Sequence, residues 1–333
     1  MTKKELVLKA FHNEATERIP VGFWHHYMEY EDFNKGMENP EIFTRNIEGH
    51  KAFKEKFSPD FLKIMTDGLF FLPYDYAVFK SAKDLKGLEC LSDDHPWFEK
   101  NLELVRTLRK MYGNDILVYF NVFAPMTQLR DGMRVLQHFG FDQDKVISFL
   151  EEDAQAVSDA LCVFAESLGV LMEKVVKEGL ADGIYFSVSN PSGDIPATIY
   201  DQFIAPSERL VIEKANKLSP DNILHICGNV GNKNMFTIYK DYEVRVVNWA
   251  VQASGMSLKD GRELFKGKAV IGGFDNAKSA TLYSGTREEI EQCTEQIVNE
   301  AGRTGLILGA DCTIPADIEI VRLNWVREIA ESL

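Results

Sequence analysis

The chain has 333 residues, of which 45% are hydrophobic and 11% aromatic, and this is enough apolar material for a large buried core. Its formal net charge of -14 would repel phosphate backbones and anionic lipid surfaces, so nucleic-acid and membrane partners are not expected. The N-terminus is interrupted by charge, no apolar run reaches the roughly 20 residues of a membrane span, and five cysteines are scattered along the chain. We therefore expect a cytoplasmic protein with reduced thiols.

The first predicted element is a short helix, because Thr2 and Glu5 form a capping-box pattern ahead of an apolar stretch. After it, short runs rich in Val, Ile, Phe and Tyr alternate with longer amphipathic stretches, as in repeated strand–helix units. Most of these runs are apolar on both faces, which is typical of buried parallel strands. Eight runs are predicted to be strands: 19–24, 61–65, 116–123, 183–188, 222–227, 244–249, 269–274 and 306–309.

The eight units favour a single α/β domain over residues 1–333, a (β/α)8 TIM barrel with a short N-terminal helical extension. We expect the first and last strands to pair, so that 19–24 lies beside 306–309. Helix ends support the pattern, because Asn39-Pro40 opens one helix and Gly302 follows another that begins near Thr286. A dinucleotide-binding sheet is not favoured, since no Gly-x-Gly-x-x-Gly follows the first strand.

Three side chains at the predicted mouth of the barrel indicate a metal site. His225 and Cys227 are two residues apart at the end of one strand, so both side chains project from the same face. Cys312 follows the last strand and falls on the same rim, where catalytic groups gather in barrels. One imidazole and two thiolates form a ligand set that leaves a fourth zinc position open. The alternative is a hydrogen-bonded core histidine with two buried cysteines, and the position of Cys312 favours zinc over it.

At these residues the chain resembles the uroporphyrinogen decarboxylase superfamily. Within that superfamily it is most similar to the zinc-dependent methylcobalamin:coenzyme M methyltransferases and related corrinoid-linked demethylases. The resemblance covers nearly the whole chain, and the family's barrel fold agrees with the strand count. Besides the segment 225–229, it rests on Phe123-Ala124-Pro125-Met126-Thr127, on 200–206, on Ile271-Gly272-Gly273-Phe274-Asp275 and on Cys312-Thr313-Ile314-Pro315.

The first strand separates the two branches of the superfamily. The true decarboxylases carry Arg-Gln-Ala-Gly-Arg after it, and these guanidinium groups clamp the carboxylates of the substrate. Here the segment 25–32 reads His-His-Tyr-Met-Glu-Tyr-Glu-Asp, and no Lys or Arg lies between Ile19 and Asn34. Asp67 does resemble the essential aspartate of the decarboxylases, but those enzymes lack the His-x-Cys pair. The methyltransferase branch is therefore the better match.

The resemblance implies a zinc-dependent methyltransferase that moves a methyl group between a small donor or thiol acceptor and a corrinoid protein. Zinc would either deprotonate a thiol or polarise an ether oxygen, and the ligands do not decide between these uses. The chain contains no corrinoid-binding Asp-x-His-x-x-Gly motif, so the methylcorrinoid is expected on a separate corrinoid-binding protein. Two alternatives stay open, a uroporphyrinogen decarboxylase-type lyase and a non-catalytic zinc- or tetrapyrrole-binding protein.

Four further residues are candidates for the site. Asp67 follows the second strand. We expect it to be a catalytic residue in the metal cavity and not a metal ligand, although aspartate before glycine is also common in turns. His25, Asp275 and Asp311 are candidates for substrate binding. Only one of His25 and His26 is expected to face the site, because neighbours in an extended chain point opposite ways. Each of the two aspartates could instead cap the following helix.

Overall fold

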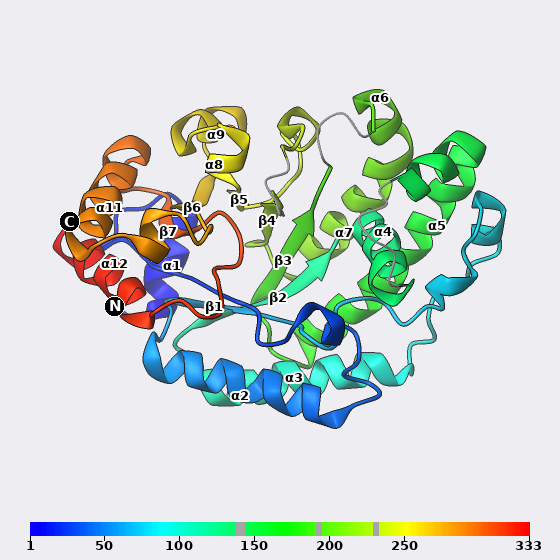
Figure 1. Ribbon diagram of the computed structural model, residues 1–333, viewed down its shortest axis with the longest axis horizontal. Coiled ribbons are helices and arrows are strands. Elements are labelled where there is room, and N and C mark those ends of the chain that lie inside the picture. The colour runs from blue at the N-terminus through cyan, green and yellow to red at the C-terminus, as the bar shows by residue number, and fades with distance from the viewer. Residues whose placement is uncertain (138–143, 191–194, 229–232) are drawn as a thin grey trace.

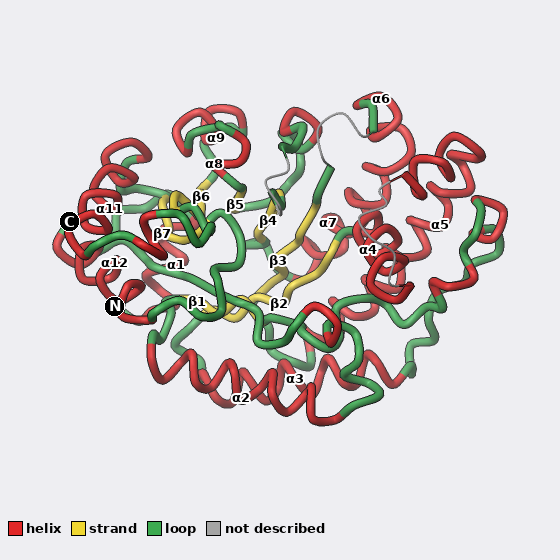
Figure 2. The backbone as a smooth tube through the Cα atoms, in the orientation of Figure 1, coloured by secondary structure: helices red, strands yellow, loops and turns green. Residues whose placement is uncertain are grey.

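The computed structural model describes residues 1–137, 144–190, 195–228 and 233–333. Its centre is one curled, fully parallel sheet in which every strand pairs with the next strand along the chain. Helices surround the outside of the sheet (Figures 1 and 2). The strands are β1 (Phe61–Ile64), β2 (Leu117–Phe123), β3 (Gly183–Val188), β4 (Ile223–Ile226), β5 (Val246–Trp249), β6 (Ala269–Phe274) and β7 (Leu306–Ala310).

A short extended segment, residues 20–22, closes the sheet between β7 and β1. Val21 forms a parallel bridge to Leu308, the Gly22 amide donates to the Leu308 carbonyl at 2.9 Å, and the Leu308 amide donates to the Pro20 carbonyl at 2.9 Å. On the other side, the Asp60 amide donates to the Val21 carbonyl at 3.0 Å. The predicted α/β barrel and the pairing of its first and last strands are therefore confirmed.

The predicted strand over 19–24 is reduced to this one bridge, and its neighbours explain why. Pro20 has no amide hydrogen to donate. The Val21 amide donates to the Asp60 carboxylate at 2.8 Å instead of to a neighbouring strand. That carboxylate also binds the Arg18 guanidinium through two hydrogen bonds, of 2.7 and 2.8 Å. A buried side chain thus takes the place of a ladder hydrogen bond at the seam.

The outer layer begins and ends its helices where the sequence predicts. Asn39 caps α2 with Pro40 in the first turn, and Thr286 and Glu289 form a capping box at the start of α11. Gly302 ends α11 with a φ of 76°, which favours glycine. The main helices are α2 (Pro40–Lys56), α3 (Pro96–Tyr112), α4 (Pro125–Gln137), α5 (Asp144–Lys177), α7 (Ala205–Leu218), α8 (Val251–Ser254), α9 (Leu258–Leu264), α11 (Arg287–Ala301) and α12 (Ile320–Ser332).

The longest of the helices given above, α5, is also strongly apolar. By length and composition alone, the stretch Lys145–Glu178 could cross a membrane, contrary to the expectation that no apolar stretch of the chain is long enough. In the structure 61% of its most apolar window is buried. This helix packs on α7 and α3. Buried core helices of soluble proteins can have the same length and apolar composition. These two properties are therefore weak evidence that the helix spans a membrane.

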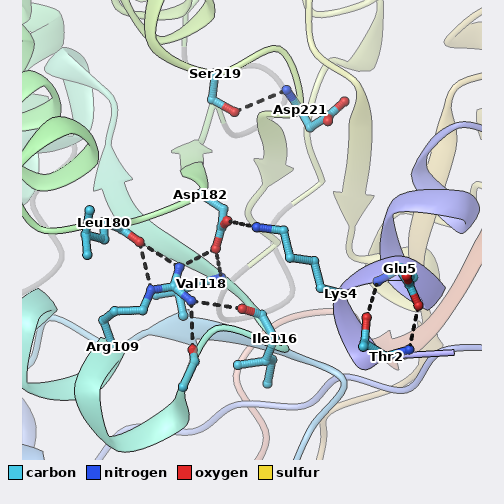
Figure 3. Close-up of polar contacts among 11 residues, drawn as sticks. Thr2, Lys4, Glu5, Arg109, Ile116, Val118, Leu180, Asp182, Ser219 and Asp221 are labelled. Atoms are coloured by element: carbon cyan, nitrogen blue, oxygen red, sulfur yellow. Dashed lines mark hydrogen bonds and ion pairs between the residues drawn. The ribbon is translucent and has the colours of Figure 1, made fainter.

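The N-terminal helix α1 (Lys3–Phe11) covers the end of the barrel where the strands begin. Its predicted capping box is confirmed, since Thr2 and Glu5 bind each other's main-chain amides at 3.1 and 2.8 Å (Figure 3). The Lys4 amide donates to the Asp115 carbonyl at 2.8 Å, just ahead of β2. The Phe11 ring packs 5.8 Å from that of Tyr119 on β2. These contacts close this end of the barrel.

Two aspartates organise the same end. Asp182 accepts hydrogen bonds from the Val118 amide at 2.9 Å, from the Lys4 ammonium at 2.8 Å, and from the Arg109 guanidinium (Figure 3). Asp221 binds His12 at 2.9 Å and Arg245 at 3.2 Å. Each carboxylate is therefore paired with basic side chains.

Candidate metal centre

The three predicted metal ligands meet at the end of the barrel where the strands finish. His225 lies on β4, Cys227 directly follows β4, and Cys312 lies two residues beyond β7. The two Sγ atoms are 3.8 Å apart, and the Cys312 Sγ is 3.6 Å from the His225 Nε2. Ligand atoms around a tetrahedral zinc lie roughly 3.5 to 3.8 Å apart, because the bonds are about 2.0 Å to nitrogen and 2.3 Å to sulfur. The donor set and its spacing therefore fit a three-ligand zinc site.

Main-chain contacts fix both cysteines. The Cys227 amide donates to the Val188 carbonyl at 2.8 Å, and its own carbonyl accepts from the Asn234 side chain at 2.7 Å. On the Cys312 side, the Asp311 amide donates to the Phe274 carbonyl at 2.8 Å and the Ile314 amide donates to the Trp24 carbonyl at 3.0 Å. The two thiols come from elements 85 residues apart, and the closure of the barrel brings them together.

Asn248 on β5 orients the histidine. Its amide nitrogen donates to the Ile271 carbonyl at 2.8 Å and to the Ala310 carbonyl at 3.2 Å, so its Oδ1 points toward His225. That oxygen accepts from the His225 Nδ1 at 2.5 Å and from the Tyr185 hydroxyl at 2.7 Å. The proton of the imidazole is thus held on Nδ1, and Nε2 presents its lone pair to the cysteines. Sequence analysis missed Asn248, although an amide inside the apolar run 244–249 is a usable signal.

The thiol of Cys312 lies in an environment that favours its ionised form. The hydrogen bond with Cys227, followed by the nearby His225 and Lys63, lowers the pKa of the Cys312 thiol well below its ordinary value, against the opposing effect of burial. A thiolate is the form that binds a metal ion.

Lys63 on β1 is a second residue that sequence analysis missed. Its side chain is 6% exposed, and the ammonium lies 4.2 Å from the centre of the Tyr185 ring and 5.0 Å from the Trp24 ring. Tyr185 in turn packs on His225 with ring centres 5.6 Å apart. Burial lowers the pKa of Lys63 to about 8, and the negative charges of Cys312, Cys227 and Asp67 act in the opposite direction. Lys63 therefore lies near the candidate centre, on the far side of the Tyr185 ring contact with His225.

Asp67 is buried just beyond β1, with 1% of its surface exposed. Its Oδ2 accepts from the Tyr27 and Met28 amides at 2.6 and 3.3 Å, and its Oδ1 contacts the His26 Nδ1 at 2.9 Å. The carboxylate thus ties the segment after residue 24 to the end of β1. Asp67 lies outside the group of three metal-ligand candidates. Its catalytic role stays a prediction.

The two adjacent histidines point to different surroundings. His26 reaches Asp67, whereas the His25 Nδ1 contacts the His26 carbonyl at 2.8 Å. The His25 ring packs edge-on against Phe53, with ring centres 5.0 Å apart, and against Tyr27. Only one of the pair therefore reaches Asp67, and it is His26. The role of His25 in substrate binding stays a prediction.

The two remaining aspartates differ in burial. Asp275 accepts a hydrogen bond from the Ala277 amide at 2.8 Å, which is the contact of a turn residue. Asp311 is 2% exposed, and its Oδ2 accepts from the Gln252 amide at 2.9 Å. Its Oδ1 is buried without a partner among the described residues, and burial raises the pKa of Asp311 to about 7. Substrate binding by either residue stays a prediction. Asn229, the last residue of the segment 225–229 on which the family resemblance rests, lies outside the described residues.

A buried acid also lies on α7, which packs on β3 and α5. Glu208 on α7 accepts hydrogen bonds from the Tyr200 hydroxyl at 2.7 Å and the Tyr242 hydroxyl at 2.5 Å. A third phenol, that of Tyr239, lies 3.1 Å from the Tyr200 hydroxyl. Burial raises the pKa of Glu208 to about 7, although both hydrogen bonds act in the opposite direction.

These features define a class, the parallel α/β-barrel proteins with a candidate metal site at the mouth of the barrel. Comparison with known families identifies the family within that class. The uroporphyrinogen decarboxylase (URO-D) family model matches residues 73–333, so the chain belongs to this family. The predicted family is thereby confirmed. Asp67 and Lys63 lie ahead of the matched residues.

Relatives fall in both branches of the family. The chain is 23% identical over 256 residues to the methylcobamide:CoM methyltransferase MtbA of Methanosarcina mazei, covering 76% of this chain and 69% of that protein. It is 21% identical over 225 residues to MtbA of Methanosarcina acetivorans, covering 67% of this chain and 61% of that protein. The chain therefore spans less than two thirds of that relative. A uroporphyrinogen decarboxylase of Prochlorococcus marinus is 25% identical over 254 residues, covering 68% of this chain and 70% of that protein.

Solved structures agree on the fold. A methyltransferase from Methanosarcina mazei superposes with a TM-score of 0.69 at 18% identity, covering 100% of this chain and 99% of that one. A putative vitamin-B12 independent methionine synthase from Listeria monocytogenes gives a TM-score of 0.54 at 12% identity, covering 94% and 96%. At these identities the likeness shows a shared barrel.

Proposed function

We propose that this protein is a zinc-dependent methyltransferase that moves a methyl group between a small donor or thiol acceptor and a corrinoid carried by another protein. The observation that carries the proposal is the convergence of His225, Cys227 and Cys312 at zinc-ligand spacing on the rim of the barrel. The MtbA relatives, which are methylcobamide:CoM methyltransferases, support the same reaction class.

The chain's own residues prepare the site. The His225 Nε2 and the two Sγ atoms would hold the ion, and Asn248 would keep the imidazole in the right tautomer and orientation. Three protein ligands leave a fourth position for substrate. When bound, zinc would supply a Lewis acid that lowers the pKa of a coordinated thiol or polarises an ether oxygen. Below the cluster, the packed rings of Tyr185 and Trp24 exclude water from this side of the site.

A second candidate function is a uroporphyrinogen decarboxylase-type lyase. The buried Asp67 favours it, because it stands where the resemblance places the decarboxylases' aspartate, and decarboxylases are among the relatives. Against it stands the segment 25–32, which offers three acids and no Lys or Arg to a polycarboxylate substrate. The methyltransferase is therefore the better-supported proposal.

The proposed reaction also implies a partner and a compartment. A methylcorrinoid needs a carrier, because the chain has no Asp-x-His-x-x-Gly motif of its own. Metal binding needs Cys227 and Cys312 as thiolates and not as a disulfide, which a reducing cytoplasm ensures.

The test combines metal content with turnover. Protein purified after growth with ample zinc should carry about one zinc per chain, and His225→Ala should lose it. His12→Ala, at the opposite end of the barrel, is the matched control and should keep it. The native protein should also demethylate a methylcorrinoid in the presence of a small thiol, which is followed by the corrinoid absorbance. Zinc-free native protein would contradict the proposal, and stepwise decarboxylation of uroporphyrinogen would replace it with the lyase.

A further inference from the structure

The side chain of Asn234 lies between the ends of β3 and β4, next to the main chain of one proposed metal ligand. Asn234 is 8% exposed. Its Nδ2 donates to the Cys227 carbonyl at 2.7 Å, and its Oδ1 accepts from the Asn190 amide at 2.8 Å. Only this orientation of the side-chain amide gives the carbonyl a donor and the main-chain N–H an acceptor. Asn234 therefore joins the first residue after β4 to the chain that leaves β3.

The register of the two strands shows which main-chain hydrogen bond this side chain replaces. In a parallel ladder a residue donates to the residue before its partner and accepts from the residue after it, as at the seam described above. Continuing the register of β3 and β4 places Cys227 opposite Ser189. The Cys227 amide does donate to the Val188 carbonyl at 2.8 Å. The second bond would run from the Asn190 amide to the Cys227 carbonyl, and these are the two groups that Asn234 bridges.

A side-chain amide in this place keeps the two strands apart at the rim of the barrel. A direct hydrogen bond would bring the main-chain nitrogen and oxygen to about 2.9 Å. Here two hydrogen bonds and the width of the amide lie between them. The position of Cys227 is therefore set by the Val188 carbonyl on one side of its peptide and by Asn234 on the other.

Buried phenols hold the segment to which Asn234 belongs, residues 234–242. The Tyr242 hydroxyl donates to Glu208 at 2.5 Å, and the Tyr239 hydroxyl lies 3.1 Å from the Tyr200 hydroxyl. Both Tyr239 and Tyr242 are buried. This anchoring runs through α7 and the residues before it, and not through β3 or β4. Asn234 is thus fixed independently of the two strands that it separates.

We propose that Asn234 is a positioning residue of the metal centre. Its amide ends the β3–β4 ladder one hydrogen bond early and aims the Cys227 thiol at the position shared with His225 and Cys312. Without it, the Asn190 amide would pair directly with the Cys227 carbonyl, which would draw Cys227 toward β3 and disturb the 3.8 Å spacing of the two Sγ atoms. This inference rests on the proposed metal centre.

The first test is Asn234→Ala. We expect its zinc affinity, measured by chelator competition, to fall about 10- to 100-fold, as for other groups that hold metal ligands in place. The visible absorption of the Co²⁺-loaded variant should also shift, because it reports the arrangement of the ligands. The thermal midpoint should fall by less than about 2 °C, because the two main-chain groups released by the substitution then pair with each other. A purely structural residue would show the reverse, a loss of stability with native zinc affinity.

A second variant, Asn234→Asp, separates the two hydrogen bonds. The carboxylate still accepts from the Asn190 amide but has no hydrogen to donate to the Cys227 carbonyl. Its added negative charge would by itself raise the affinity for a dication. We expect a zinc affinity at least tenfold below that of the native protein, and this fall would assign the effect to the lost donor.

The matched control is Asn216→Ala. Asn216 on α7 makes the same two kinds of contact at the opposite end of the barrel. Its Nδ2 donates to the Glu243 carbonyl at 2.7 Å, and its Oδ1 accepts from the Asn222 side chain at 2.9 Å. This variant should lower the thermal midpoint and leave the zinc affinity and the Co²⁺ absorption native.

The outcomes separate this inference from the proposed function. Native zinc affinity in Asn234→Ala or in Asn234→Asp would overturn the inference, and so would equal changes in Asn234→Ala and Asn216→Ala. Failure of both Asn234 variants to fold would assign Asn234 a purely structural role and overturn it as well. A native protein that binds no zinc would overturn the metal centre and this inference with it. If the native protein binds zinc but transfers no methyl group, the proposed reaction fails, and a lower zinc affinity of Asn234→Ala still supports the inference.

Discussion

The two ends of the barrel treat buried charge in opposite ways. At the end covered by α1, Asp221 binds the basic side chains of His12 and Arg245. Asp182 binds Lys4 and Arg109 there, and the Arg109 guanidinium is surrounded by acceptors (Figure 3). At the mouth, one oxygen of Asp311 is buried without a partner among the described residues, and the Lys63 ammonium lies over the Tyr185 and Trp24 rings without an ion pair to a described carboxylate. Satisfied charges stabilise a fold, whereas unsatisfied ones remain available for ligands. The difference teaches that stability and function are separated along the barrel axis.

The largest effect on stability is expected at the covered end. Asp182→Ala would leave Arg109 buried without its carboxylate and the Val118 amide without its acceptor, so unfolding should become easier by about 3 kcal/mol. Urea denaturation measures this change, and metal content should stay native. Asp201→Ala, which breaks an exposed pair with Arg209, should cost less than about 0.5 kcal/mol. Loss of metal from Asp182→Ala would show that the two ends are coupled.

A smaller effect of a different kind is expected at the mouth. Asn248→Ala removes the acceptor that orients His225, so the zinc affinity should fall roughly 10- to 100-fold. Competition with a chromogenic chelator measures it. Asn101→Ala, on α3, removes another buried amide that bonds only the Trp97 carbonyl, and it should leave zinc affinity native. If both variants lose zinc equally, a general loosening of the fold and not histidine orientation is the cause.

A third prediction concerns Glu208, a buried acid held by phenols and not by a cation. Its pKa is about 7 in the folded protein against 4.5 as the ordinary value, so folding takes up a proton between these pH values. Stability from this group is therefore full below about pH 4.5 and is lost as the pH rises through about 7. Across that window the native protein should lose roughly 3 kcal/mol more stability than Glu208→Gln, because each pKa unit of the shift is worth about 1.4 kcal/mol.

The matched control for this prediction is Glu213→Gln on the same helix, where the carboxylate is exposed and pairs with Lys217. Its stability should follow the native pH profile. Urea denaturation at several pH values measures both variants. A Glu208→Gln profile parallel to that of the native protein would show that Glu208 is ionised throughout, like the paired acids at the covered end.

The smallest effect is expected at the helix that closes the barrel. Thr2→Ala removes the capping box of α1 and should lower the stability by about 1 kcal/mol. Thr286→Ala does the same to α11 on the outer layer and should cost a similar amount. Thermal unfolding compares them. A much larger cost for Thr2→Ala would mean that α1 acts as an essential plug and not as an ordinary helix.

The parts of the fold that depend on local pattern were predictable. Apolar runs marked the strands, and Thr2, Asn39 and Thr286 marked helix starts, because a cap needs only its own next turn. The spacing of His225 and Cys227 and the position of Cys312 after a strand were sufficient to propose the metal centre. Asn248 and Lys63 were missed, and His25 was chosen over His26, since the contacts that distinguish these residues lie between segments distant in sequence. The loss of the first strand to the Asp60 carboxylate is equally non-local.

The seam at residues 20–22 makes the wall of the barrel uneven. Elsewhere neighbouring strands share paired registers, as between β6 and β7. At the seam, one bridge to β7 and, on the β1 side, the Asp60 amide and carboxylate join the sheet. Packing leaves no slack, because a Cβ at Gly22 would come within 2.2 Å of the Phe61 ring. Slow opening motions start where few main-chain hydrogen bonds must break. The barrel therefore has its weakest strand pairing at this seam. Among the barrel amides, those of Gly22 and Leu308 should exchange their hydrogens first, beside the segment that leads to His26 and Asp67.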